Sequence, residues 1–544
     1  MRQSAKNPSF KRKHKNRDTR SLSTFNSLIR QLNAGLRGRF VLFAAGAVVF
    51  WLVVCAPVPR TLLELVQEPQ PKGYTLGTGA TTIQQNVSKL LGKPLTARQV
   101  AGKAKIMVGI LLFAAFLWAT EAIPIGATDL LVGSLMYLFF ILPFDSISKA
   151  YMKDAVFFIF GVLALAVGVS KTGLDRRIAA LMLRRIRGLK SLCFVFFPLL
   201  SVCAGFFSEH ALMAILVPVL CVLYRGACDL AHVKQDRALG LLLILGTCFA
   251  LNQGGPGSPA AGGRNSVMVG YFKDFGAPIL FEQWLVYAMP YVLVVSLVVG
   301  TFMYFAFKGR IKACVDFTRL SGKELGRQGK PTGREITMAF IFLLVVALWI
   351  TCSKRFGLGG PSIFGLVLML VLGVINWHDV QTHVRFDVVG LYAAACAMGV
   401  GLKTTGGALW LARCTVGLLP ETLRHGDALL IAVSAFTGTL TNFMSDGATV
   451  AAIGPVALSM AHVSGVHIWK IGLVCAFSSS FANALIVGTP NNAIGYVGAL
   501  DPETGNKLVR LKDFLIYGVP TTVLAWLVLW GWAVFGYWRW LEWK

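Results

Sequence analysis

The sequence is poor in charged residues, and in acidic residues above all. Only 14% of its 544 residues are charged, and 25 Asp and Glu stand against 52 Lys and Arg. Soluble domains carry about a quarter charged residues, so this composition argues against a soluble protein. A net charge of +27 is compatible with nucleic-acid binding, but the basic residues lie in short segments between apolar runs. We therefore expect no nucleic-acid partner.

Other absences narrow the function further. The eleven cysteines include no C-x-x-C pair and no His/Cys ligand spacing, so neither a disulfide framework nor a metal-binding motif is indicated. No phosphate-binding glycine loop is present, and nothing therefore suggests that ATP drives the protein. No nucleophile constellation occurs either. These absences predict that the chain is not an enzyme and uses no cofactor.

Long apolar runs are what the sequence does contain. Hydrophobic residues make up 55% of the chain, and a membrane-spanning helix needs about 20 of them in a row. The alternation of outer-membrane barrels is missing, so the spans should be helices. We predict an all-α polytopic membrane protein. Clear runs lie near 40–57, 105–125, 128–146, 155–174, 238–252, 283–307, 336–352, 361–376, 386–402 and 513–537.

The basic residues set the predicted orientation, because loops rich in Lys and Arg stay in the cytoplasm. Residues 1–39 hold eleven Lys and Arg against one acid and are predicted to form a basic cytoplasmic tail. Residues 40–57 then form the first transmembrane helix, 58–104 an extracytoplasmic segment and 308–335 a cytoplasmic linker. The predicted location is the cell inner membrane, as a multi-pass protein with a cytoplasmic N-terminus.

Two parts of the chain resemble each other. Ser208–His210 lies ten residues before a proline within an apolar stretch, and so does Ser445–Gly447. Further on, residues 262–265 correspond to 489–492. The offsets are 237 and 227 residues, nearly constant, as one duplication would give. We predict repeats over 105–307 and 336–540, and an odd number of spans in each would invert the second copy.

Each repeat combines a polar triplet with a glycine- and proline-rich break. Such breaks are disfavoured in helices, because Gly and Pro cost about 1 and 3 kcal/mol, and in a membrane they persist only where protein or water satisfies the backbone. We expect triplets and breaks to form one solute and ion pocket. The predicted substrate-binding residues are Ser208, Glu209, His210, Gly262, Gly263, Arg264, Asn265, Ser445, Asp446, Gly447, Thr489, Pro490 and Asn492.

Glu209 and Asp446 occupy the same position in the two triplets, and a charge within a membrane is costly enough to indicate function. A buried carboxylate can exchange a proton or bind Na⁺ as its surroundings change, so both are predicted to couple transport to a cation. Arg264 is either a clamp for an anion or a salt-bridge partner of Glu209. His210 either titrates or acts as a plain hydrogen-bonding group.

Several motifs resemble one family of membrane proteins. Trp118–Pro124 resembles the W-x-T-E-A-I-P signature of the divalent anion/sodium symporter family, which includes sodium/dicarboxylate and sodium/sulfate cotransporters. Gly488–Ala493 is similar to its second-half break, and Ser445–Gly447 resembles the N-D-G of the related arsenite permeases. The likeness extends from about residue 105 to 537.

The resemblance implies about eleven transmembrane helices and two re-entrant hairpins in an inverted repeat. It also implies a scaffold domain, a moving transport domain, an elevator motion and a homodimer in the lipid bilayer. In this family the hairpin tips bind the substrate carboxylate and sodium together. Carried over, the cation-coupling residues are Ser208, Glu209, Thr441, Asp446 and Gly488, with Na⁺ at Glu209 and Asp446.

The triplets depart from the Ser-Asn-Thr of the family. Both Asn positions are acidic, and the Thr positions hold His210 and Gly447. A bare carboxylate about 4 Å from a substrate carboxylate costs roughly 4 kcal/mol at an effective dielectric of 20. The coupling ion is therefore left open between H⁺ and Na⁺. We predict a secondary transporter of a small anion, a di- or tricarboxylate or sulfate-like; the alternative is a cation/proton antiporter or a carrier of another small solute.

Overall fold

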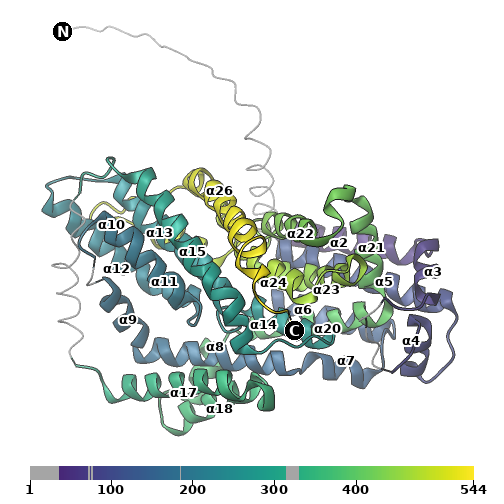
Figure 1. The fold of residues 1–544 in the computed structure, drawn as a ribbon. Coiled ribbons are helices and arrows are strands. Elements are labelled where there is room, and N and C mark those ends of the chain that lie inside the picture. The colour runs from purple at the N-terminus through teal and green to yellow at the C-terminus, as the bar shows by residue number, and fades with distance from the viewer. Residues whose placement is uncertain (1–35, 72–73, 75–77, 184–185, 314–329, 544) are drawn as a thin grey trace, which may run out of the picture.

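The computed structural model describes residues 36–543, apart from 72–73, 75–77, 184–185 and 314–329 (Figure 1). The predicted all-α polytopic fold is confirmed. Within the described residues, ten helices are long and apolar enough to span a membrane, against about eleven expected. Shorter apolar helices, such as Ile125–Leu138 and Gly426–Leu440, account for further apolar segments.

The helices fall into an N-terminal group and two series with the same order of elements. The N-terminal group is α2 (Leu36–Cys55), α3 (Arg60–Gln67) and α4 (Ile83–Leu91). The first series is α5 (Ala97–Thr120), α6 (Ile125–Leu138), α7 (Phe144–Tyr151), α8 (Asp154–Thr172), α9 (Leu174–Leu183), α10 (Leu189–Ser191), η1 (Leu192–Phe196), α11 (Phe197–Ala204), α12 (Glu209–Leu230), α13 (Arg237–Gly254), η2 (Gly255–Gly257), α14 (Gly263–Asp274) and α15 (Phe281–Phe307).

The second series repeats this order from a long helix to a long helix. It consists of α17 (Gly333–Phe356), α18 (Gly359–Val371), α19 (Trp377–His383), α20 (Phe386–Thr405), α21 (Gly407–Leu418), η3 (Glu421–Leu423), α22 (Gly426–Leu440), α23 (Asp446–Ser464), α24 (Ile468–Ser478), α25 (Pro490–Gly498), α26 (Leu511–Val528), η4 (Leu529–Val534) and η5 (Tyr537–Arg539). Long, short, amphipathic and long helices follow one another in α5–α8 and again in α17–α20.

The two series are interlocked by exchanged pairs of helices. α18 packs on α8, and its counterpart α6 packs on α20. In the same way α25 packs on α12, and α14 packs on α23. Each helix of a corresponding pair therefore contacts the other series, which brings the starts of α12, α14, α23 and α25 to one place in the molecule. The opposite orientation of the two series stays a prediction.

The helix boundaries differ from the predicted ones where polar residues continue a helix beyond its apolar run. α5 begins at Ala97 and not at 105, because Thr96 and Gln99 form a capping box at its start. α17 begins at Gly333, inside the predicted linker, with a capping box formed by Thr332 and Glu335. Most of the predicted tail and residues 314–329 lie outside the described residues. The domain limits themselves stay predictions.

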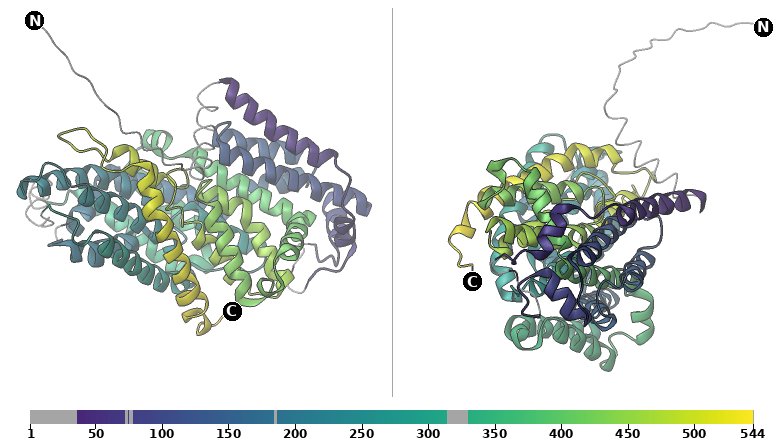
Figure 2. Two further views of the ribbon diagram at one scale, coloured as in Figure 1. Left: turned by 90° about the horizontal axis from the view of Figure 1, so that it is seen from above. Right: turned by 90° about the vertical axis from the view of Figure 1, so that its right-hand side faces the viewer.

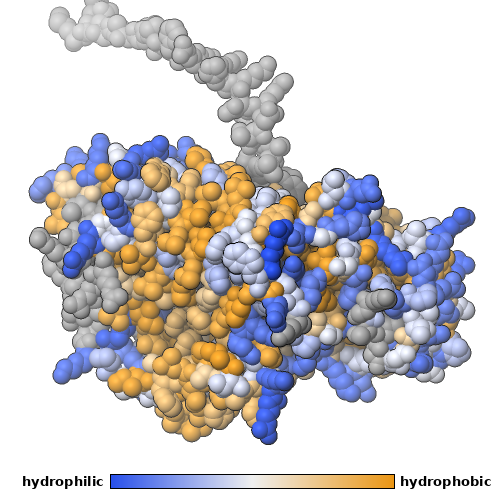
Figure 3. Space-filling view, viewed as in Figure 1, coloured by the Kyte–Doolittle hydropathy of each residue, from blue (hydrophilic) through white to orange (hydrophobic). Residues whose placement is uncertain are grey.

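Segment 58–104 is partly helical and lies at one end of the molecule. α3 and α4 pack against α5 through an apolar cluster that includes Leu65, Val87 and Leu409 of α21. α2 lies along the outside of α5 (Figure 2), where Phe50 lies beside Gly109. Figure 3 shows a continuous apolar surface over the part of the molecule built by α15, α17 and α18, with hydrophilic residues concentrated above it and at the end that holds α3 and α4. That division fits a protein embedded in lipid.

Candidate functional site

The two polar triplets lie at corresponding helix starts. We call Ser208–His210 the first tip and Ser445–Gly447 the second tip. Ser208 is the N-cap of α12 and accepts a hydrogen bond from the Ala211 amide at 3.4 Å. Ser445 is the N-cap of α23 and accepts one from the amide three residues on, at 3.3 Å. Each serine thus accepts a hydrogen bond from a backbone N–H that has no partner within its helix. The acids that follow, Glu209 and Asp446, lie in the first turns of the two helices.

The breaks are held by one asparagine in each series. We call residues 255–262 the first break and 479–489 the second break. Asn265 donates from its side-chain amide to the carbonyls of Gly255 at 2.8 Å and Ser258 at 2.7 Å. Asn492 donates to the carbonyls of Ala482 and Leu485 at 2.7 and 2.9 Å. In both series the acceptors lie ten and seven residues before the asparagine, so the breaks share one geometry.

A large cavity lies where the tips meet the breaks. Its volume is about 1110 Å³, enough for a small organic ion with water. The lining includes every residue of both tips, the N-cap and the first residue of α14, and the N-cap and the first residue of α25. These predicted site residues are Ser208, Glu209, His210, Gly262, Gly263, Ser445, Asp446, Gly447, Thr489 and Pro490.

Arg264 joins the two tips behind the cavity wall. Its Nη1 donates to Glu209 Oε1 at 2.8 Å and also to Asp446 Oδ2. Arg264 is only 2% exposed and does not contribute to the cavity lining. The sequence left open whether Arg264 clamps an anion or forms a salt bridge with Glu209. In this structure Arg264 is a salt-bridge partner of both acids. Two carboxylates and one guanidinium, all ionised, leave a net charge of −1.

Polar atoms of this network remain without hydrogen bonds. Among the described residues, Glu209 Oε2 and the Nε and Nη2 atoms of Arg264 are buried and have no hydrogen-bond partner. Unpaired buried polar atoms cost about 1–3 kcal/mol, and more when charged. The network is therefore a poor stabiliser of the fold. Its free carboxylate oxygen is a position where a proton or a small cation can bind.

The first tip also contacts α25 through Asn491, which was not among the predicted site residues. His210 Nδ1 lies 2.8 Å from Asn491 Oδ1, and Asn491 donates to Asn252 Oδ1 at 2.9 Å. Asn491, the second residue of α25, corresponds to Arg264, the second residue of α14 (264 + 227 = 491). This correspondence was the sequence signal for Asn491, because both positions carry polar side chains. In the structure both side chains reach a tip.

The other predicted residues lie near the site but not on the cavity wall. Asn265 and Asn492 are fully buried and hold the breaks. Thr441 is also fully buried, and its hydroxyl donates to the Ser479 carbonyl at 2.6 Å. Gly488 lies against the Thr441 carbonyl oxygen, where a side chain would collide. Thr441 and Gly488 therefore shape the turn before the second tip.

The opposite wall of the cavity carries further polar groups. Tyr392 of α20 lines it beside Gly447 of the second tip. Lys171, at the end of α8, forms an ion pair with Asp379 of α19, and Arg385 pairs with Asp387 at 3.3 Å through its Nε. Tyr392 could not be singled out from the sequence, because it lies in an apolar run without a motif.

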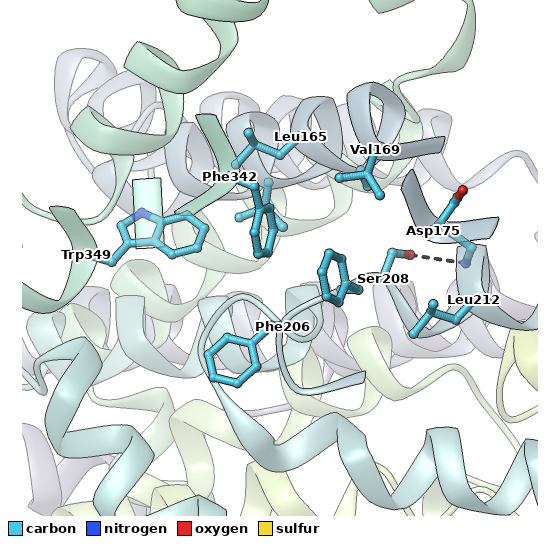
Figure 4. Close-up of a pocket in the computed structure, with 12 residues that line it drawn as sticks. Leu165, Val169, Asp175, Phe206, Ser208, Leu212, Phe342 and Trp349 are labelled. Carbon is cyan, nitrogen blue, oxygen red and sulfur yellow. Dashed lines mark hydrogen bonds between the residues drawn. The ribbon is translucent and has the colours of Figure 1, made fainter. Parts of the chain in front are cut away.

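A smaller pocket of about 30 Å³ adjoins the first tip (Figure 4). Its wall is mainly apolar and includes Phe206, Phe342 and Trp349, and Ser208 and Asp175 lie at one end. Ser208 lines both this pocket and the main cavity. The first tip is thus flanked by this small apolar pocket on one side and by the main cavity on the other.

Membrane-length helices, interrupted helices and a cavity lined by both polar tips define the chain as a membrane transporter. A family model described as "Sodium:sulfate symporter transmembrane region" matches residues 94–544. The chain therefore belongs to this symporter family, and it is a multi-pass integral membrane protein and not an enzyme, as predicted. The predicted divalent anion/sodium symporter resemblance is confirmed.

Relatives and solved structures were also found. The chain is 25% identical over 458 residues to the sodium-dependent dicarboxylate transporter SdcS of Staphylococcus saprophyticus, covering 79% of this chain and 85% of the relative. It is 27% identical over 422 residues to SdcS of Staphylococcus aureus, covering 72% and 79%. The solved YdaH transporter of Alcanivorax borkumensis has 13% identity and a TM-score of 0.48, and the match covers 79% of this chain and 99% of that one.

Proposed function

We propose that the protein is a secondary active transporter that moves a small anion, a di- or tricarboxylate or sulfate-like, in symport with Na⁺ or H⁺. The family and the relatives named as sodium-dependent dicarboxylate transporters support the class of solute and a role for sodium. The observation that carries the proposal is the contact of Glu209 and Asp446, one from each series, with the same buried Arg264 at the cavity.

The charge of this group explains why a cation would be required. With all three side chains ionised the group has a net charge of −1, and a carboxylate solute about 4 Å away would be repelled by roughly 4 kcal/mol at a dielectric of 20. One bound Na⁺ or H⁺ removes that net charge. Glu209 Oε2 is buried and unpaired among the described residues, and it is the oxygen best placed to bind it. Cation and anion would then bind together.

The transport motion follows from the same arrangement. The tips directly contact the helices that follow the breaks, α14 through Arg264 with both acids and α25 through Asn491 with His210. They would move as one body against α8 and α20, which form the other wall, in an elevator motion. We also propose a homodimer in the inner membrane, with the basic loops in the cytoplasm.

The alternative is a cation/proton antiporter or a carrier of another solute, and the acidic tips favour it. Uptake into proteoliposomes distinguishes the two. Labelled succinate, citrate, sulfate and sodium would each be offered with and without an inward Na⁺ or H⁺ gradient. The proposal expects gradient-driven uptake of at least one anion. Sodium uptake that is driven by an opposing proton gradient and needs no anion would contradict it and select the antiporter.

A further inference from the structure

Tyr392 fills a space that two glycines leave open. Gly263 begins α14, and Gly447 lies in the second tip. A side chain built at either glycine would collide with the Tyr392 phenol, and at Gly447 its Cβ would lie 2.8 Å from the hydroxyl oxygen. Pro490 and His210 are their counterparts in the other series, and both carry side chains. The tyrosine ring therefore occupies the space that side chains at Gly263 and Gly447 would take.

The Tyr392 side chain borders the cavity. It forms no hydrogen bond with the described residues, whereas Tyr271, in the same interface of α14, α20 and α23, donates to the carbonyls of Ala395 and Ala451 at 3.1 and 3.0 Å. A buried phenol normally finds a hydrogen-bond partner. Tyr392 lines the cavity and Tyr271 does not, so a bound solute can satisfy the Tyr392 hydroxyl.

The corresponding helix brings no such group. α8 and α20 are related by an offset of 233, as shown by Gly173 and Gly406, which end them (173 + 233 = 406). The counterpart of Tyr392 is therefore Ile159 (159 + 233 = 392), which also lines the cavity. The opposite wall thus presents one hydroxyl and one aliphatic side chain at equivalent places, so the site is asymmetric.

We propose that Tyr392 is a specificity-determining residue whose hydroxyl donates a hydrogen bond to an oxyanion oxygen of the solute bound between the tips. The inference rests on the proposed anion transport. A phenol is neutral and adds a donor beside Asp446 without adding charge. It would select solutes that place a carboxylate or sulfate oxygen next to Gly447, and it would disfavour solutes that place an apolar group there.

Tyr392→Phe tests this role, because it removes one oxygen and keeps the ring that packs on the glycines. Hydrogen bonds to charged groups contribute enough to predict a roughly 10- to 100-fold higher KM for the anion. Maximal rate and cation dependence should be unchanged. Tyr271→Phe is the matched control, since it also removes a phenol oxygen in this interface. It should lower thermal stability and leave KM unchanged.

The outcomes separate the inference from the proposed function. Active anion uptake with an unchanged KM in Tyr392→Phe contradicts the role of Tyr392 alone, and so does an equal KM change in Tyr271→Phe. Absence of any anion uptake by the wild-type protein overturns the proposed function, and this role with it. Gly447→Ala provides a second test: its clash with the hydroxyl should reduce uptake, and Tyr392→Phe in the same chain should restore part of it. Failure of that rescue would contradict the proposed packing.

Discussion

Replacing Arg264 by Gln is expected to expose how strongly the two acids depend on it. Both carboxylates contact a single guanidinium nitrogen, so their oxygens lie at most about 6 Å apart, given ordinary hydrogen-bond lengths. Without the arginine, two charges at that distance repel by about 3 kcal/mol at a dielectric of 20. Loss of the partner of a buried ion pair typically costs about 3–5 kcal/mol. Arg264→Gln should therefore be strongly destabilising.

A double-mutant cycle measures the part of this cost that belongs to the pair. Glu209→Gln would be introduced in the wild-type chain and in Arg264→Gln, and the free energy of unfolding followed by denaturant titration in mixed micelles. We expect a coupling energy of at least about 2 kcal/mol, because Glu209→Gln removes an attraction in the first chain and a repulsion in the second.

The surface pair Arg413 and Glu68, with side chains 39% and 47% exposed, is the matched control and should couple by less than about 1 kcal/mol. Additive effects of Arg264→Gln and Glu209→Gln, within about 0.5 kcal/mol, would refute the shared-charge reasoning. Equal coupling in both pairs would refute it as well.

Two further predictions concern the breaks and Asp379, which lines the cavity. Asn265→Ala and Asn492→Ala should each destabilise the protein by about 2 kcal/mol, because each removes two buried hydrogen bonds to the carbonyls of a break. Unfolding titrations should give similar values for the two variants, and hydrogen exchange should be faster only in the affected break. The backbone N–H of Asn376 and the ammonium of Lys171 hold the pKa of Asp379 below its ordinary value. The ionised Asp379 therefore contributes its full stabilisation at every pH above that ordinary pKa. This stabilisation is lost only as the pH falls through the lowered pKa of the folded protein. The ratio of uptake by wild type and Asp379→Asn should therefore stay constant between about pH 5 and 8, and a ratio that changes within this range would contradict the assignment.

The fold class could be predicted from the sequence because lipid requires long apolar helices, and the number and spacing of the apolar runs reflect them. The site was also partly predictable. Glu209 and Asp446 recur at one position of the repeat, and the structure brings them together through Arg264. α5 begins at Ala97, before the apolar run near 105–125, since polar residues such as Arg98 and Lys103 belong to the same helix.

The rest of the site depends on contacts that no local pattern encodes. Tyr392 lies in an apolar helix and acquires its role only because α20 packs against two glycines from different series. Asn491 appeared in the aligned break, but its hydrogen bond with His210 joins residues 281 positions apart. Thr441 was carried over from the family resemblance, and the structure places its hydroxyl on a carbonyl away from the cavity lining.

The most direct measurement of the central claim is the cation dependence of anion counterflow in Glu209→Gln and Asp446→Asn. Each substitution changes the charge of the three-residue group from −1 to 0, so a cation would no longer be needed to admit the solute. We predict that counterflow in each variant becomes independent of Na⁺ and of pH, while a gradient of either ion no longer drives accumulation. Cation dependence identical to that of the wild-type protein in both variants would contradict the claim that these two acids couple the transporter.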